Sequence, residues 1–452
     1  MPDNVSFMDE SQDLRHIRET SRTSHTTSIL NVEGDYRNND MPREPGECNR
    51  STNGTVDHER MTPSADGGIP IAICGIGLRL PGGIRNDRDL YDSLYNKKDA
   101  RGVIPEDRFS IDSFHSAHGK TGTIITKHGY FLQDIDLTKF DVNMFNMTPA
   151  EVERLDPHQR ILLETVRETL ESAGEASFRG KKVGTYVGNF TDDWLDLQNV
   201  DTVDFATYQL HGKMDFSLAN RISYEYDLRG PSMTIKTACS SSALAIHEAV
   251  YSIRNGECDA AIVSGSNLNL APRLWVGMSS QGAISPDGSS KTFDESANGY
   301  ARGDGIAALF IKRLDDAVRD GNPVRAVIRS TASNADGRTP GMTMPSTEAQ
   351  EALIRRAYDA ANLPLSETAM VECHGTGTAV GDPMEANAVA RCFGDQGMLI
   401  GSVKPNLGHS EGASAITSVV KAVLSLENRT ILPNIKFHRP NPASMYPLLH
   451  RA

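Results

Sequence analysis

The sequence lacks any apolar stretch near the ~18 consecutive residues of a membrane-spanning helix, and its N-terminus has no apolar signal-peptide core. Its six cysteines include no CxxC pair and no Cys/His cluster with zinc-ligand spacing, so we expect no metal and a reducing, cytoplasmic location. An excess of basic residues is also missing, because 59 Asp and Glu outnumber 46 Lys and Arg and the net charge is −13. This balance argues against nucleic acid or an anionic membrane as the main partner.

Residues 1–68 contain no lysine and only 15 hydrophobic residues, against 13 acidic residues and seven arginines. A segment this polar cannot offset its own ordering entropy by burial, so it is expected to be a disordered acidic leader. Hydrophobic residues make up 38% of the whole chain, which is enough for a sizeable core in the remainder.

From Ile69 onward, short apolar runs alternate with helical patterns, which predicts a largely parallel sheet with helices on both faces. The run Ile71–Gly77 is typical of a strand buried on both faces, punctuated by glycines. It does not match a dinucleotide fingerprint, because Pro81 interrupts the helix that should follow. Further strands are expected at Val183–Gly188, Met233–Ile235, Ala260–Ser264, Ile306–Ile311, Val324–Arg329, Met370–Cys373 and Leu399–Val403. Helices are expected at Pro157–Gly174, Ala243–Arg254, Thr347–Ala361, Pro383–Cys392 and Ala413–Glu427.

Cys239 is the first candidate catalytic residue. It lies in the sequence TACSSS between an expected strand and an expected helix. A thiol at a helix N-terminus faces free N–H groups and the positive end of the helix dipole, which favours thiolate and predicts a lowered pKa. The alternative is a buried structural cysteine, and that interpretation is preferred for Cys74, Cys258 and Cys392. A strand–Cys–helix turn is also compatible with a hydrolase.

Two further motifs follow expected strands. His374 lies in ECHGTGT, and Lys404, Asn406 and His409 lie in GSVKPNLGHSEG. Open α/β sheets bind ligands at the carboxyl ends of their strands, so these side chains are candidates for one shared site. Each histidine taken alone could equally be a hydrogen-bonded structural residue.

The three motifs resemble the active-site motifs of β-ketoacyl synthases. The flanking stretches NRISYEYDLRGPSMTIKTACSSS, SPDGSSKTFDESANGYARGDG and GDPMEANAVA are similar to ketosynthase domains of type I polyketide synthases, most closely the fungal iterative, highly reducing branch. The similarity runs from about Ile69 to about Pro442. Three ordered motifs are far more specific than a single one.

The resemblance implies a thiolase-like fold in which two similar βαβαβ halves form a five-layer α-β-α-β-α sandwich, usually in a homodimer. The N-terminal half is expected at residues 69–320, with the nucleophile. The C-terminal half is expected at residues 321–452, with both histidines and incomplete at its end. Similar ketosynthases continue into a GFGGTNAH-like loop that supplies an oxyanion-hole N–H group, and this sequence contains no such loop.

The resemblance also implies a decarboxylative Claisen condensation between an acyl group on Cys239 and a malonyl thioester. His374 and His409 then donate hydrogen bonds to the oxygen on which enolate charge develops. Lys404 is expected to order the histidines and a neighbouring acidic group, assigned to Glu411, with Asn406 in support. The alternative for Lys404 is a structural buried ion pair.

No intrinsic cofactor is expected. The substrates implied are acyl and malonyl thioesters on a phosphopantetheine carrier, and the partners are an acyl carrier protein and an acyltransferase. Three alternatives stay open: a Cys–His hydrolase, a thiolase-type condensing enzyme without the paired histidines, and a truncated, inactive remnant or thiolase-fold binding protein. A lost core strand would expose a sheet edge in such a remnant.

Overall fold

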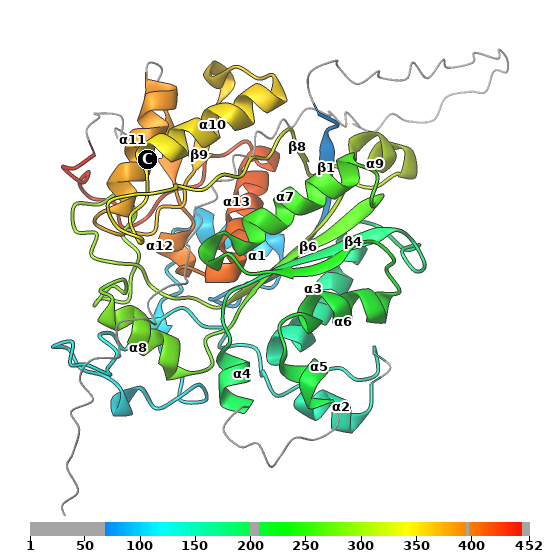
Figure 1. Ribbon diagram of the computed structural model, residues 1–452, viewed down its shortest axis with the longest axis horizontal. Coiled ribbons are helices and arrows are strands. Elements are labelled where there is room, and N and C mark those ends of the chain that lie inside the picture. The colour runs from blue at the N-terminus through cyan, green and yellow to red at the C-terminus, as the bar shows by residue number, and fades with distance from the viewer. Residues whose placement is uncertain (1–67, 146, 199–207, 395–396, 445–452) are drawn as a thin grey trace, which may run out of the picture.

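Figure 1 shows the computed structural model of the chain, which describes residues 68–145, 147–198, 208–394 and 397–444. The expected acidic leader lies outside these ranges except for Gly68, and so do residues 445–452 of the expected C-terminal half. Within the described ranges, no helix combines the length and the apolar character needed to cross a membrane.

A six-stranded mixed sheet forms the centre of the molecule. Its spatial order is β5 (Ser232–Ile235), β4 (Val183–Asn189), β6 (Ala260–Asn267), β7 (Gly305–Arg313), β1 (Ile71–Arg79) and β8 (Ala326–Ile328). β4 pairs in parallel with β5 and β6, whereas β7 is antiparallel to β6 and β1, and β8 is antiparallel to β1. The prediction of a largely parallel sheet is therefore wrong here. Of the neighbouring pairs in this sheet, only β4–β5 and β4–β6 are parallel, and helices lie between these strands along the chain, as parallel neighbours require.

Helices cover both faces of this sheet (Figure 1). On one face lie α3 (Pro157–Ser172) and α6 (Ser217–Tyr226), and on the other lie α7 (Ser241–Arg254) and α13 (Ser414–Glu427). Beyond α13 is a second, parallel sheet of β9 (Met370–Glu372) and β10 (Leu399–Gly401), which α10 (Thr347–Ala361) and α11 (Gly381–Phe393) cover. The described residues thus follow the expected α-β-α-β-α order of layers.

β1 shows why the sheet is buried on both faces. Ile71 and Ile73 pack into the apolar cluster that contains α7 and α13, whereas Ala72 and Cys74 pack toward α3 and α6. The strand does not stop at its glycines but continues through Gly75 and Gly77 to Arg79. A Cβ on Gly77 would lie 2.5 Å from the carbonyl oxygen of Thr165, so this glycine lets α3 approach the sheet closely. The glycines therefore serve packing, not phosphate binding.

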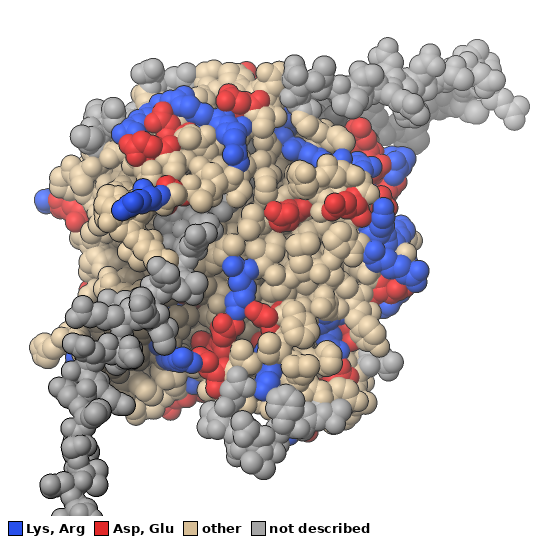
Figure 2. Space-filling model, viewed as in Figure 1, with Lys and Arg blue, Asp and Glu red and all other residues tan. Residues whose placement is uncertain are grey.

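Shorter elements connect these layers. They are α1 (Asp87–Tyr95), β2 (Gly102–Val103), η1 (Ile111–Ser113), β3 (His128–Gly129), α2 (Pro149–Arg154), α4 (Asp193–Gln198), α5 (Gln209–Lys213), η2 (Ala238–Ser240), α8 (Pro272–Ser280), α9 (Leu314–Asp320), η3 (Leu365–Glu367), α12 (Lys404–Leu407) and η5 (Glu411–Ala413). On the face seen in Figure 2, acidic and basic side chains are interspersed. That face offers no continuous basic stripe of the kind that tracks a nucleic-acid backbone.

Candidate active site

Cys239, His374 and His409 converge at one place. The Cys239 thiol and one nitrogen of each histidine all lie within 4.8 Å of one another. The two imidazole rings are 5.2 Å apart between centroids and nearly perpendicular, at 84°. The three side chains come from segments that follow β5, β9 and β10, so the structure brings together residues that are 170 positions apart in the sequence. A single small molecule can touch all three.

A tight elbow presents Cys239. β5 leads into the 3-10 turn η2, where Ala238 adopts a left-handed φ of +55°, and α7 begins two residues after the cysteine. The hydroxyls of Ser240 and Ser241 donate to the carbonyls of Thr237 and Ala238 at 2.7 Å, which fixes the turn. A left-handed alanine costs roughly 1–2 kcal/mol, so the surrounding packing must hold this geometry.

Burial raises the pKa of the Cys239 thiol, and the nearby positive charge of Lys404 offsets only part of that effect. The prediction of a lowered pKa is therefore wrong for the substrate-free protein. The sequence shows the helix N-terminus but not the depth at which the thiol lies. The raised pKa favours the protonated thiol, and the reactive thiolate forms as pH rises.

Two buried carboxylates of α11 hold the loop that carries His374. Glu385 accepts the backbone N–H groups of His374 at 2.6 Å and of Gly375 at 2.8 Å. Asp382 accepts the N–H group of Gly377 at 3.0 Å, and burial raises its pKa to about 7. Gly375 has a φ of +49°, and a Cβ there would lie 2.6 Å from a methyl group of Thr292. Both carboxylates are site residues that no local sequence signal reveals, although the ketosynthase-like stretch GDPMEANAVA contains them.

Replacing Glu385 with alanine is expected to lower the free energy of unfolding by roughly 2–5 kcal/mol, because it leaves two buried N–H groups without an acceptor. Urea unfolding at neutral pH measures this difference. Glu348→Ala is the matched control, since the Glu348 side chain is 74% exposed and pairs with Arg391 at the surface. If Glu385→Ala lowers the free energy of unfolding no more than Glu348→Ala does, Glu385 does not stabilise the loop that carries His374.

His409 is fixed as a neutral hydrogen-bond donor. Its Nδ1 accepts the backbone N–H of Glu411 at 3.0 Å, so that nitrogen carries a lone pair. Burial and the charges of Lys404 and Arg302 hold the pKa of His409 well below its usual range. A neutral imidazole with an accepting Nδ1 carries its proton on Nε2. The edge of His409 also contacts the ring of Tyr300, with 5.2 Å between centroids.

Lys404 and Glu411, which were expected to pair with each other, have different charged partners in the structure. Lys404 is 1% exposed, and burial lowers the pKa of its ammonium group, an effect that the nearby carboxylates of Glu372 and Glu385 only partly oppose. Glu411 is bound instead by Arg302, with Nε–Oε1 and Nη2–Oε2 distances of 2.7 and 2.8 Å. The assignment of Glu411 as the acidic group ordered by Lys404 is therefore corrected, because a guanidinium already occupies both of its oxygens.

Asn406 lies outside the cluster. Its Nδ2 donates to the carbonyl of Lys98 at 2.8 Å, and its own carbonyl accepts the N–H of Ala100 at 2.9 Å. Its side chain is fully buried. Asn406 therefore ties α12 to the segment after α1 through both its side chain and its backbone, and supports the site by holding that helix in place.

The Cys–His–His cluster has a donor composition that zinc uses in catalytic sites. A zinc ligand must offer a lone pair, but His409 presents the N–H of Nε2 because its Nδ1 lone pair is occupied by Glu411. The ammonium of Lys404 acts on both Cys239 and His409 and opposes a second cation. The donor set therefore suits a developing anion better than a metal ion.

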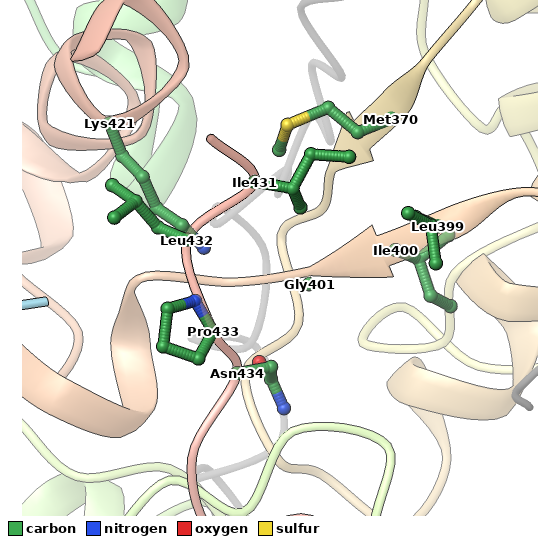
Figure 3. Close-up of a pocket in the computed structure, with 9 residues that line it drawn as sticks. All are labelled: Met370, Leu399, Ile400, Gly401, Lys421, Ile431, Leu432, Pro433 and Asn434. Carbon is green, nitrogen blue, oxygen red and sulfur yellow. The ribbon is translucent and has the colours of Figure 1, made fainter. Parts of the chain in front are cut away.

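A cavity of about 170 Å³ lies behind the catalytic loops (Figure 3). Residues of β9, β10, α13 and the segment 431–434 line it, and none of the three clustered side chains does. Lys421 extends into it from α13 and pairs with Glu372 at 2.7 Å. The other oxygen of Glu372 accepts the N–H of Val403 at 2.7 Å. This cavity therefore borders the supports of the site and not its reacting groups.

Comparison with solved structures shows the same fold. A ketosynthase from module 6 of the bacillaene synthase of Bacillus subtilis 168 aligns with a TM-score of 0.75 and 34% identity, over 83% of this chain and 64% of that one. A ketosynthase domain of the oxazolomycin system of Streptomyces albus JA3453 aligns with a TM-score of 0.77 and 33% identity, over 82% and 66% of the two chains. The fold is therefore α/β and thiolase-like, as predicted.

Curated relatives are much longer proteins. A highly reducing polyketide synthase of Fusarium sp, g433, is 55% identical over 87% of this chain, and a squalestatin hexaketide synthase of Phoma sp. is 55% identical over 84%. The chain spans about 15% of the length of each. Family profiles match residues 69–317 as a β-ketoacyl synthase N-terminal domain and residues 325–438 as the C-terminal domain. The chain belongs to the β-ketoacyl synthase family, within the ketosynthase branch found in fungal highly reducing polyketide synthases.

Proposed function

We propose that the chain is a polyketide ketosynthase that condenses a Cys239-bound acyl group with a malonyl thioester, with loss of CO₂. The observation that carries this proposal is the convergence of one thiol and two imidazoles within 4.8 Å. The family membership supports the same reaction class.

Acyl loading is a thioester exchange. The Cys239 sulfur attacks the acyl carbonyl, the bond to the carrier sulfur breaks, and the proton of Cys239 ends on the departing thiol. This covalent step separates chain transfer from chain extension, so neither has to occur in a three-body collision. The pKa of the Cys239 thiol is raised, so loading is fastest when pH increases the thiolate fraction.

Extension begins when the malonyl carboxylate leaves as CO₂ and its bonding electrons move into the thioester, which becomes an enolate. The Nε2–H of His409 donates to the enolate oxygen, and His374, whose ring centroid lies 5.2 Å from that of His409, donates to the same oxygen. The enolate carbon then attacks the Cys239 thioester. The C–S bond breaks, and the released thiolate takes up the one proton that the overall reaction consumes.

The geometry favours this chemistry over a Cys–His hydrolase. A hydrolase needs an imidazole with an unprotonated nitrogen toward the thiol or water, so that the ring can accept a proton. His409 does not fit that role, because its Nδ1 accepts from Glu411 and its Nε2 therefore carries the proton. The pair of histidines likewise fits a decarboxylating synthase better than a thiolase-type enzyme without that pair.

Loading can be tested directly on the chain itself. Incubation with hexanoyl-N-acetylcysteamine thioester, followed by peptide mass spectrometry, should place a hexanoyl adduct on Cys239. An unlabelled Cys239 in protein that melts cooperatively would reject the enzymatic proposal and favour a binding role. A non-cooperative melt would instead support a structural remnant.

The substrates proposed are acyl and malonyl groups on the phosphopantetheine arm of a carrier protein, supplied with an acyltransferase and with no cofactor of the ketosynthase itself. The curated relatives are polyketide synthases several times longer than this chain, which supports partner domains of this kind. We also propose that the reaction takes place in the cytoplasm. The five described cysteines are all free, which supports a reducing compartment.

We further propose a homodimer formed through β5, which is an edge strand of the large sheet. Unpaired edge backbone is a template for a second strand. Met233 on β5 is 39% exposed, and Phe216 and Tyr224 near it are 42% and 77% exposed. Such apolar exposure beside an open edge supports pairing between two copies.

Sedimentation velocity should show a dimer for the unmodified chain, and Met233→Lys should shift it toward monomer because two buried ammonium groups would face each other across the new interface. Val318→Lys is the control, since Val318 is 61% exposed on α9, far from β5 in the sheet order. A monomer at every concentration, or equal dissociation by both variants, would contradict the β5 interface.

A further inference from the structure

Arg302 and Glu411 form a fully buried ion pair beside the catalytic cluster. Arg302 is 0% exposed and Glu411 is 2% exposed. The guanidinium grips both carboxylate oxygens, at 2.7 and 2.8 Å, and its Cζ lies 5.0 Å from the centre of the Trp275 ring. A bidentate pair of this kind, with two parallel hydrogen bonds, fixes the orientation of the carboxylate as well as its distance from the guanidinium. Both side chains are buried and neither belongs to the cluster of Cys239, His374 and His409, so we look for an effect on the reaction through a neighbour.

That neighbour is His409. The backbone of His409 is bracketed by residues on either side of Arg302: its N–H donates to Ala301 at 2.7 Å, and its carbonyl accepts from Gly303 at 2.9 Å. The side-chain pair repeats the same connection two residues later, at Glu411. Two independent links therefore join the segments 301–303 and 409–411, one through the backbone and one through the ion pair.

Glu411 needs such support because its backbone is strained. Its φ of +38° lies in the left-handed region, which residues with a Cβ rarely adopt. In this conformation its N–H points at Nδ1 of His409, at 3.0 Å. A Glu411 free to relax would move that N–H away and leave Nδ1 able to carry the imidazole proton.

The charge of Glu411 also needs Arg302. A lone buried carboxylate two residues from His409 would favour protonation of the imidazole, whereas the paired guanidinium cancels most of its field. The pair thus places a backbone donor against Nδ1, and the charge of its guanidinium opposes protonation of the ring, in line with the lowered pKa of His409.

We propose that Arg302 and Glu411 are positioning residues, which hold the Glu411 N–H on Nδ1 of His409 so that Nε2 carries the proton toward the substrate. The proposal rests on the ketosynthase function only for its catalytic consequence. With the other tautomer, Nε2 would direct a lone pair at the enolate oxygen and repel the charge that it should stabilise.

The first test is the tautomer itself, which can be read without any substrate. In the full chain labelled with ¹⁵N-histidine, the signals missing from His409→Gln assign His409. At neutral pH the unmodified protein should show a protonated Nε2 and an unprotonated Nδ1. A protonated Nδ1 would overturn the proposal, whatever the activity.

The second test uses Arg302→Lys, which removes the bidentate hydrogen bonding to Glu411 but keeps the positive charge. Arg302→Lys should give a mixture of both His409 tautomers and lower malonyl-thioester decarboxylation by roughly tenfold or more, while Cys239 loading changes less. Glu411→Gln, which keeps shape and loses charge, provides a second variant should Arg302→Lys fail to melt cooperatively. Arg79→Lys is the matched control, because Arg79 forms a similar fork with Glu168 at 2.5 and 2.6 Å on another part of the protein.

The outcomes separate the two proposals. A single Nε2–H tautomer and unchanged decarboxylation in both Arg302→Lys and Glu411→Gln would reject the positioning role. The expected tautomer in an unmodified protein that neither loads Cys239 nor decarboxylates malonyl thioester would uphold the positioning role and reject the ketosynthase function. An equal effect of Arg79→Lys would show general destabilisation and overturn the proposal.

Discussion

Cys239→Ala is expected to reduce acyl loading and condensation by at least about 10⁴-fold, the loss typical when a covalent nucleophile is removed. The reason is that Cys239 supplies the only thiol of the cluster as the structure describes it, and His409 presents a protonated nitrogen that cannot attack the acyl carbonyl. Decarboxylation of malonyl thioester should persist within about tenfold, because it depends on donors to the thioester oxygen and not on the sulfur.

The measurement combines peptide mass spectrometry after incubation with hexanoyl thioester and CO₂ release from malonyl thioester. Cys392→Ala is the control, because Cys392 is the other partly exposed thiol among the described cysteines and lies beside Glu351, outside the cluster. If acylation survives in Cys239→Ala but is lost in Cys392→Ala, the nucleophile is Cys392 and the role given to Cys239 is wrong.

The loading step should also depend on pH in a defined direction. Because the Cys239 pKa is raised, the neutral thiol predominates at neutral pH and the loading rate should increase by up to about tenfold per pH unit as the thiolate fraction grows. A rate that stays flat across neutral and mildly alkaline pH would indicate a thiolate already formed, as the helix dipole alone predicts.

The amino-acid sequence predicts the elements of this fold well where burial leaves a continuous apolar run. The expected strand Val183–Gly188 corresponds to β4, Val183–Asn189, and the expected helix Thr347–Ala361 has the bounds of α10. Strand direction is a different matter. A strand buried on both faces has the same apolar pattern in either direction, so Ile306–Ile311 could not reveal that β7 runs antiparallel to both neighbours.

In the candidate site, too, residues in local motifs are predictable from the sequence, whereas pairs of residues far apart in the sequence are not. Cys239, His374 and His409 stand at strand ends in recognisable motifs, and the structure places them together. Arg302 lies in a ketosynthase-like stretch, but the sequence does not mark it as a site residue, because its partner Glu411 is 109 residues away and no local pattern joins them. The expectation that Lys404 orders Glu411 came from the family resemblance, and the sequence alone does not show that Arg302 binds both oxygens of Glu411.

His409→Ala is expected to spare acyl loading and lower malonyl decarboxylation by about 10²–10³-fold, the usual loss on removing one preorganised donor to a developing oxyanion. The loss concerns only decarboxylation, in which charge develops on the malonyl thioester oxygen. Loading occurs before the malonyl group enters and develops charge on the acyl carbonyl oxygen instead, and the sulfur of Cys239 remains in place. His247→Ala is the control, because His247 lies on α7 and binds Thr331 through Nδ1 at 2.8 Å, away from the cluster.

The pH dependence of decarboxylation then decides which form of His409 acts. A mechanism that needs an imidazolium predicts a rate that falls as pH rises through the ordinary histidine pKa. The pKa of His409 is held well below that range by burial and by Lys404, so the ring is neutral on both sides of it. The decarboxylation rate of the unmodified protein should therefore show no titration of His409 between about pH 6 and pH 8. A fall in rate with a midpoint in that interval, abolished in His409→Ala, would show that the charged ring is the catalyst and that its Nδ1 does not accept from Glu411 during turnover.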